Sequence, residues 1–333
     1  MNAPTRRALL ASAALLAGGA APAPMPPTAI TIVSGSPASL TSLELLNAGP
    51  GGHFAAAGLQ AEVVSVATAT SAMQALVAGR AAFARTAAGE LFKAAARQSV
   101  PLVAIAEVTH DVNFDLVSAA DRPVQTPEQL RGRRIGVLGA GSITDTYLDL
   151  LLRSSGLAPS DAERIVVGAD PASFALVRQG RLDAVILSGD LSAQLRWSGE
   201  RTAVWSVGDI VSMPGRCYVA TRAFIEQQPR TAAAFIRAML ASMREIQGGD
   251  LATLLTRDRA VTDIPGPADP ALAAAMVQLQ INAWQSDGPG TLLRLNPARW
   301  GAARDALAAA GIADIPDVTT LFTNRFVEEA ARA

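Results

Sequence analysis

The fold is indicated by a stretch that occurs twice, as Gly79-Arg80-Ala81-Ala82-Phe83-Ala84 and as Gly180-Arg181-Leu182-Asp183-Ala184-Val185. In each copy, a glycine that ends a helix is followed by a short apolar run typical of a buried strand. The two glycines lie 101 positions apart in the 333-residue chain. A spacing this long indicates two related folding units rather than a solenoid, whose repeats are much shorter.

The residues before these stretches also repeat in the same order. Ala29–Val33 is a β-branched run followed by a polar loop and a helical pattern, and Arg134–Leu138 begins the same series in the second unit. A strand, a loop and a helix then recur at 62–78 and at 164–179. Three matches in one order predict an α/β fold with two similar lobes, each a mainly parallel sheet flanked by helices and joined by right-handed crossovers.

Proline-containing joins divide the chain. Pro123–Gly132 predicts the entry into the second lobe, and Met213-Pro214-Gly215 predicts its end. The helical patterns that follow have only the first lobe to cover, so we expect a discontinuous first lobe and a hinge of two crossovers that can close on a ligand. The expected divisions are 1–27 for a signal peptide, 28–118 with 213–333 for the first lobe, and 119–212 for the second.

The first 27 residues have the pattern of an export signal. Arg6-Arg7 precede the apolar run Ala8–Ala17, and the small residues Gly18–Ala23 are typical of a cleavage region. A membrane-spanning helix needs roughly 20 apolar residues, so this run is too short to be one. The paired arginines fit either a twin-arginine or a Sec signal. Both routes predict a periplasmic protein.

The composition excludes several classes of function. The chain has 28 basic and 29 acidic residues, so it has no excess of positive charge for nucleic acid. Lys93 is the one lysine, so a buried anion is expected to meet arginine. Cys217 is the one cysteine, which excludes an intrachain disulfide and thiolate clusters. Because neither a Gly-x-Ser-x-Gly elbow nor a His-x-x-x-His pair occurs, we expect no metal, no cofactor and no catalysis.

Charged residues stand at the carboxyl ends of two predicted strands, where open α/β sheets bind their ligands. Arg85 ends the strand that follows Gly79, and a guanidinium there offers a bidentate partner to a carboxylate or sulfonate. The alternative is a surface arginine paired with Glu90. Asp190 holds the matching place in the second lobe, and it either accepts a hydrogen bond from the amine of a zwitterionic ligand or locks the hinge.

Hydroxyl side chains in the loops after the strands are further candidate ligand contacts. Each of them either binds the ligand or caps a helix. The loop 139–144 begins Gly-x-Gly but lacks the third glycine of a dinucleotide site, so it fits a small anion at a helix start better. The candidates are Ser36, Thr70, Ser71, Ser142 and Thr144.

The order of these motifs resembles the periplasmic substrate-binding proteins of ABC importers, in the NMT1-like group for taurine, nitrate, sulfonate and thiamine precursors. The likeness spans nearly the whole mature chain and implies the type II periplasmic-binding-protein fold. One departure is Ala82, where such proteins often carry an aspartate that the second lobe keeps as Asp183. The motifs that carry the resemblance are Gly52–Leu59, Ala75–Gly79, Leu130–Val137, Gly180–Ala184 and Asp317–Val327.

The resemblance also implies a function. Such a protein captures a small anionic or zwitterionic organic molecule between its lobes and delivers it to a permease in the inner membrane. We expect it to act as a monomer without a cofactor. Two alternatives remain at this stage, a small-molecule enzyme on the same scaffold and a ligand-binding receptor for a membrane sensor. The identity of the ligand does not follow from the fold.

Overall fold

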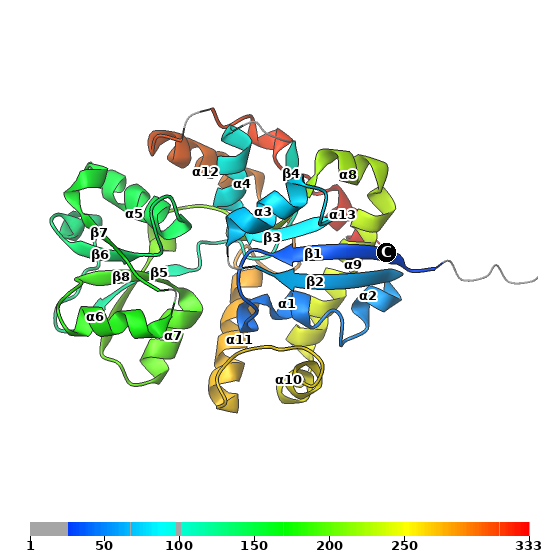
Figure 1. Ribbon diagram of the computed structural model, residues 1–333, viewed down its shortest axis with the longest axis horizontal. Helices are drawn as coiled ribbons and strands as arrows, with labels where there is room; N and C mark the ends of the chain where they lie inside the picture. The colour runs from blue at the N-terminus through cyan, green and yellow to red at the C-terminus, as the bar shows by residue number, and fades with distance from the viewer. Residues whose placement is uncertain (1–25, 67, 98–100, 169, 313, 333) are drawn as a thin grey trace, which may run out of the picture.

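The computed structural model describes residues 26–66, 68–97, 101–168, 170–312 and 314–332. These residues form two lobes, each built around a five-stranded sheet (Figure 1). The expected signal peptide lies almost entirely outside the described residues. Among the helices in the described ranges, none has the length and apolar character needed to cross a membrane.

The sheet of the first lobe has the strand order β2-β1-β3-β10-β4. β1 pairs in parallel with β2 and β3, whereas β10 runs antiparallel to both of its neighbours. Every residue of β4 is buried, as expected for a strand that is covered on both faces. The strands are β1 (Thr28–Ser34), β2 (Leu59–Ser65), β3 (Phe83–Ala87), β4 (Leu102–Glu107) and β10 (Arg216–Thr221).

The sheet of the second lobe has the order β7-β6-β8-β5-β9 and the same arrangement of directions. β6 pairs in parallel with β7 and β8, and β5 runs antiparallel between β8 and β9. The two sheets correspond strand by strand, which confirms the two similar α/β lobes predicted from the repeat. The strands are β5 (Phe114–Ala119), β6 (Arg134–Val137), β7 (Glu163–Val166), β8 (Ala184–Ser188) and β9 (Thr202–Ser206).

Two crossovers join the lobes, residues 108–113 between β4 and β5 and residues 207–215 between β9 and β10. The second sheet begins at Phe114, five residues before the division expected at 119. The composition of 114–119 does not identify the sheet to which this strand belongs, because that is decided by its pairing with β8 and β9. The division expected at 213 falls inside the second crossover.

Helices cover both sheets, and the helices that follow β10 return to the first lobe (Figure 1). α9, α11 and α12 each begin with proline, whose fixed φ and missing N–H suit a first helical turn. The α-helices are α1 (Leu43–Leu46), α2 (His53–Ala56), α3 (Ala69–Val77), α4 (Ala88–Ala96), α5 (Ile143–Ser154), α6 (Phe174–Arg178), α7 (Gly189–Trp197), α8 (Arg222–Gln227), α9 (Pro229–Gly248), α10 (Leu251–Arg259), α11 (Pro270–Trp284), α12 (Pro297–Ala309) and α13 (Arg325–Ala331). The 3-10 helices are η1 (Leu40–Ser42), η2 (Pro127–Leu130), η3 (Pro159–Asp161), η4 (Pro171–Ser173), η5 (Val207–Asp209) and η6 (Val318–Thr320).

The lobes also touch each other away from the crossovers. Lys93 Nζ in α4 donates to the Gly141 carbonyl of the second lobe over 3.0 Å. A Cβ added to Gly89, also in α4, would come within 2.8 Å of Ile143 Cδ1, so the two lobes approach each other closely here. On another side, α11 contacts both η1 of the first lobe and α7 of the second (Figure 1). The residues that lie between the α4 contacts on one side and the α11 contacts on the other therefore have both lobes around them.

Candidate functional site

Arg85 lies in β3, where the structure encloses it. Its side chain is 1% exposed. Nε donates to Glu44 Oε1 over 2.6 Å, and Nη2 donates to the Thr41 carbonyl over 2.5 Å. Burial alone would lower the pKa of Arg85, but the Glu44 carboxylate raises it above its ordinary value. Arg85 is therefore a charged and rigidly held group.

The alternative that Arg85 is a surface residue paired with Glu90 is wrong. Glu90 instead lies 3.3 Å from Lys93, one turn further along α4. The partner of Arg85 is Glu44, which also accepts a hydrogen bond from the Tyr218 hydroxyl at 3.1 Å. Glu44 escaped the sequence analysis, although a single carboxylate within the apolar run Leu43–Leu46 was a signal for it.

Several polar atoms around this ion pair are buried and have no hydrogen-bond partner among the described residues. They are Nη1 of Arg85, Oε2 of Glu44 and the hydroxyls of Ser34 and Ser36. Ser34 and Arg85 are neighbours in the β1–β3 register. An unpaired buried polar group costs about 1–3 kcal/mol, so a group of four such atoms indicates a place for a bound polar molecule.

Arg216 is a second arginine at this place, and the sequence analysis did not identify it. It begins β10, where its backbone N–H donates to Thr109 Oγ1 over 2.8 Å. Burial, and after it the nearby charge of Arg85, lower the pKa of Arg216 to about 10. Among the described residues, none pairs with its guanidinium. The one sequence signal was its position, directly after Met213-Pro214-Gly215 and before an apolar run.

Asp190 brings the second lobe to the same place. It lies in the first turn of α7 and is 8% exposed. Its Oδ1 has no hydrogen-bond partner in the described ranges, and its negative charge opposes the lowering of the pKa of Arg216. Asp190 and Arg216 are thus electrostatically coupled across the two lobes, yet they form no ion pair within 4.0 Å.

Most of the other hydroxyls expected at the site form hydrogen bonds within their own loops. Thr68 caps α3 and shares a hydrogen bond of 2.9 Å with Ser71, and Thr70 is exposed. Ser142 caps α5, and Thr144 Oγ1 accepts the Leu138 N–H over 2.9 Å. For Ser71, Ser142 and Thr144, the structure shows local hydrogen bonds. A role in ligand binding stays a prediction for these three residues and for Thr70.

The arrangement at the lobe junction is suited to binding. It offers an anion the guanidinium of Arg216 and Nη1 of Arg85, and it offers a cation the carboxylate of Asp190. The thiol of Cys217 is buried in β10, and burial raises its pKa, which disfavours a thiolate nucleophile. Within the described ranges, no group of three or more His, Cys, Asp or Glu residues is placed to hold a metal ion.

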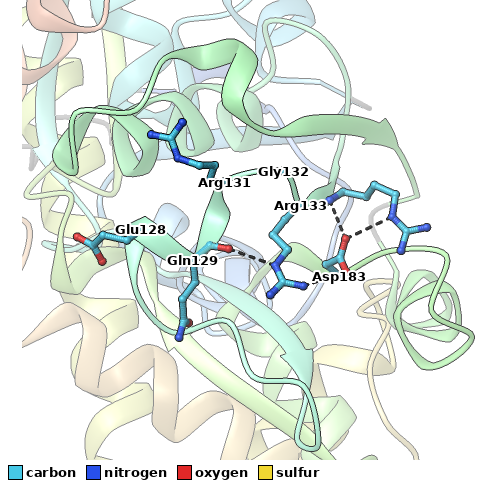
Figure 2. Close-up of a pocket in the computed structure, with 7 residues that line it drawn as sticks. Glu128, Gln129, Arg131, Gly132, Arg133 and Asp183 are labelled. Carbon is cyan, nitrogen blue, oxygen red and sulfur yellow. Dashed lines mark hydrogen bonds and ion pairs between the residues drawn. The ribbon is translucent and has the colours of Figure 1, made fainter.

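A separate polar pocket of about 530 Å³ lies in the second lobe (Figure 2). It is lined by Arg131, Arg133, Arg134 and Asp183, among others. Asp183 accepts hydrogen bonds from the backbone N–H of Arg134 at 2.8 Å and from its Nε at 3.3 Å. The pocket lies at the amino ends of β6 and β8, opposite the strand ends that face the first lobe.

Two five-stranded sheets with this topology, joined by two crossovers, define a two-lobe periplasmic-binding-protein fold. Solved structures with the same fold include a protein from Bordetella bronchiseptica RB50, with a TM-score of 0.72 and 23% identity over 92% of this chain and 97% of that one. The NMT1/THI5-like family model matches residues 41–247, more than half of the chain, so the protein belongs to this family. No curated protein sequence matches the chain significantly.

Three further structures share the fold. The periplasmic aliphatic sulphonate binding protein SsuA from Escherichia coli has a TM-score of 0.67 and 16% identity, over 88% of this chain and 91% of that one. The periplasmic nitrate-binding protein NrtA from Synechocystis PCC 6803 has a TM-score of 0.65 and 15% identity, over 92% and 89%. The desulfurization enzyme DSZB has a TM-score of 0.56 and 12% identity, over 91% and 99%. The fold alone therefore fits both binding proteins and an enzyme.

Proposed function

We propose that this protein is an extracytoplasmic solute-binding protein that captures a small organic anion or zwitterion between its two lobes and delivers it to an ABC importer. The observation that supports this most directly is the relation between Arg216 and Asp190. They come from different lobes, their charges act on each other, and neither has an ion-pair partner among the described residues. A molecule that carries a negative group, or both charges, satisfies this arrangement.

The chemistry of the two arginines favours a carboxylate or a sulfonate. A guanidinium is a planar fork that binds such groups through two parallel hydrogen bonds. Arg216 has no partner in the part of the chain that the structure describes and supplies that fork, whereas Arg85 is held by Glu44 and Thr41 through Nε and Nη2, and its Nη1 makes no hydrogen bond there. A group that is already held in place loses little conformational entropy on binding, which favours affinity.

The structural neighbours support a transport role. SsuA and NrtA are described as sulphonate-binding and nitrate-binding periplasmic proteins. With the export signal expected at 1–27, their likeness supports a periplasmic location and an inner-membrane permease as partner, and we propose that the protein acts as a monomer. Twin-arginine and Sec export both remain compatible with this proposal.

We infer that the chain is a binding protein rather than an enzyme. At the lobe junction, the described residues bring together arginines, carboxylates and hydroxyls, and the buried His110 of the first crossover lies 3.8 Å from the carboxylates of Glu107 and Asp287 rather than beside a nucleophile. DSZB shows that a related scaffold is used by an enzyme, so turnover of the bound molecule is the discriminating measurement. The alternative of a receptor for a membrane sensor is distinguished from an importer component by measuring uptake of the solute. A sensor receptor would support no uptake even when a neighbouring permease is present.

The test is native mass spectrometry of the protein purified from the periplasm of its host, followed by small-angle scattering with and without the molecule it carries. We expect one small anion or zwitterion per chain and a smaller radius of gyration when it is bound. A chain that carries no small molecule and keeps the same radius at every concentration of candidate anions would contradict the proposal.

A further inference from the structure

Helix α11 forms a wall of the lobe junction that contains no charged side chain on its buried face. It contacts η1, which carries the Thr41 carbonyl bound by Arg85, and α7, which carries Asp190. Its last turn lies against the first crossover, since the His110 N–H donates to the Ala283 carbonyl over 3.3 Å. Figure 1 shows α11 standing between the two lobes beside α7. The helix therefore lies next to the charged residues of the proposed site.

The buried face of α11 carries two polar side chains one turn apart. Gln280 is 1% exposed and Trp284 is fully buried. Oε1 and Nε2 of Gln280 and Nε1 of Trp284 have no hydrogen-bond partner among the described residues. The rest of this face is apolar and consists of Ala273, Met276 and Val277. Packing alone is better served by an apolar side chain at 280, because it would leave no amide unpaired.

We propose that Gln280 and Trp284 form a neutral hydrogen-bonding subsite that binds an uncharged polar end of the same ligand, a carboxamide or a group with the same donors and acceptor. This inference rests on the proposed function and deepens it. The ligand class is a small organic anion with a carboxylate or sulfonate at one end and a carboxamide at the other.

The chemistry of the two side chains selects this class. A carboxamide pairs reciprocally with the amide of Gln280, donating to Oε1 and accepting from Nε2, and its carbonyl has a second lone pair for the Trp284 N–H. A hydrocarbon end leaves all three buried groups without partners. A second charged end is also disfavoured, because neutral groups compensate poorly for burying an ion.

The experiment uses two pairs of compounds with matched shapes and calorimetric titration of the purified protein. Succinamate is compared with isocaproate, and sulfopropionamide with isopentanesulfonate, so that each pair exchanges a carboxamide for an isopropyl group. We expect the carboxamide of at least one pair to bind about 10-fold or more tightly than its hydrocarbon partner. Equal or tighter binding of both hydrocarbons overturns the subsite, and so does the absence of binding by all four compounds.

Three variants assign the preference to these residues. Gln280→Leu should abolish the preference for the carboxamide without lowering the melting temperature, because it removes an unpaired buried amide. Trp284→Phe should reduce the preference in part. Gln278→Leu is the matched control, since Gln278 lies on the exposed face of α11 and pairs with Asn282. A preference that survives Gln280→Leu overturns the subsite.

These outcomes are separable from failure of the proposed function. If anions bind at the lobe junction with no preference for the carboxamide, the solute-binding function stands and the subsite falls. If the protein carries no small molecule from the periplasm and no anion compacts it, the proposed function falls as well.

Discussion

Arg85 Nε and Glu44 Oε1 lie 2.6 Å apart in an ion pair whose side chains are 1% and 0% exposed. The pair joins β3 to α1, and the Tyr218 hydroxyl from β10 donates to the same carboxylate. The Glu44 carbonyl also accepts a hydrogen bond of 2.6 Å from Ser242 of α9. One buried pair thus ties the sheet of the first lobe to two of its helices while it holds an arginine at the proposed ligand site.

We predict that Arg85→Ala lowers the free energy of unfolding by about 3–5 kcal/mol, because it leaves Glu44 as an unpaired buried charge. Urea denaturation measures this loss. The double variant Arg85→Met with Glu44→Leu should regain most of the stability, since no charge is then buried. A loss below about 1 kcal/mol, the range of exposed ion pairs, would contradict the burial of this pair.

Arg216→Ala should have the opposite profile. The guanidinium has no partner among the described residues, so we expect stability close to that of the wild type. Affinity for the anion that co-purifies with the protein should fall about 10- to 150-fold, since hydrogen bonds to charged groups contribute about 1.5–3 kcal/mol. Arg216→Lys should recover part of the affinity, because lysine keeps the charge but lacks the fork.

The control for this titration is Arg237→Ala, at an exposed position of α9. It changes the net charge of the protein as Arg216→Ala does, and it lies away from the lobe junction. If both variants bind the anion as tightly as the wild type, Arg216 has no role in the site.

The repeat at Gly79 and Gly180 was sufficient to predict the two lobes. A helix stop followed by a buried strand is a local pattern, so its recurrence is readable without any knowledge of long-range contacts. The same reasoning expected Arg85 and Asp190 at matching strand ends, but Arg85 lies in the middle of β3 and Asp190 lies in the first turn of α7, two residues after β8 ends. It did not predict that β5 belongs to the second sheet, because this depends on pairing with β8 rather than on the composition of 114–119.

The contacts of the site that the sequence did not reveal are formed between residues that are far apart in the chain. Glu44 lies 41 positions before Arg85, and no spacing rule connects a helix carboxylate to a strand arginine. Arg216 gains its surroundings only when β10 returns to the sheet of the first lobe and pairs between β3 and β4. The hydroxyls of Ser71 and Ser142 suited both capping and ligand binding, and the same side-chain chemistry serves both roles.

The stability of the first lobe should depend on Glu245 in a pH-dependent way. Hydrogen bonds from Arg257, which outweigh the effect of burial, lower the pKa of Glu245 to about 2, with further bonds from Asn47 and His53. A carboxyl group whose pKa is lower in the folded state stabilises the fold above its ordinary value of 4.5, and this stabilisation is lost as the pH falls towards 2.

Glu245→Gln should therefore cost about 1–2 kcal/mol at neutral pH, a value reduced for the partial exposure of the side chain. The difference from the wild type should shrink when urea denaturation is repeated at decreasing pH between 5 and 2. Glu328→Gln, at a half-exposed carboxylate of α13, is the control. A difference that stays constant with pH would show that Glu245 acts through packing and not through its charge.

Lys93 offers a direct measurement of lobe closure, because it is the one lysine of the chain and its amine bridges the lobes. With Nζ bound to the Gly141 carbonyl at 3.0 Å and to Glu90 at 3.3 Å, the side chain is 13% exposed. Opening of the lobes breaks the bond to Gly141 and frees the amine for reaction. A ligand that stabilises the closed state should therefore protect Lys93 from acylation.

We expect a saturating concentration of the co-purified anion to slow acetylation of Lys93 about 5-fold or more, because slow reaction then requires a rare opening. Peptide mass spectrometry measures the rate, and the α-amine of the mature chain provides an internal reference whose rate should not change. Arg216→Ala should lose the protection at the same anion concentration, since it weakens binding without disturbing the bond from Lys93 to Gly141. If Lys93 is acetylated at the same slow rate with and without the anion, the lobes stay together at α4 regardless of ligand. The binding mechanism would then require an opening elsewhere than at α4.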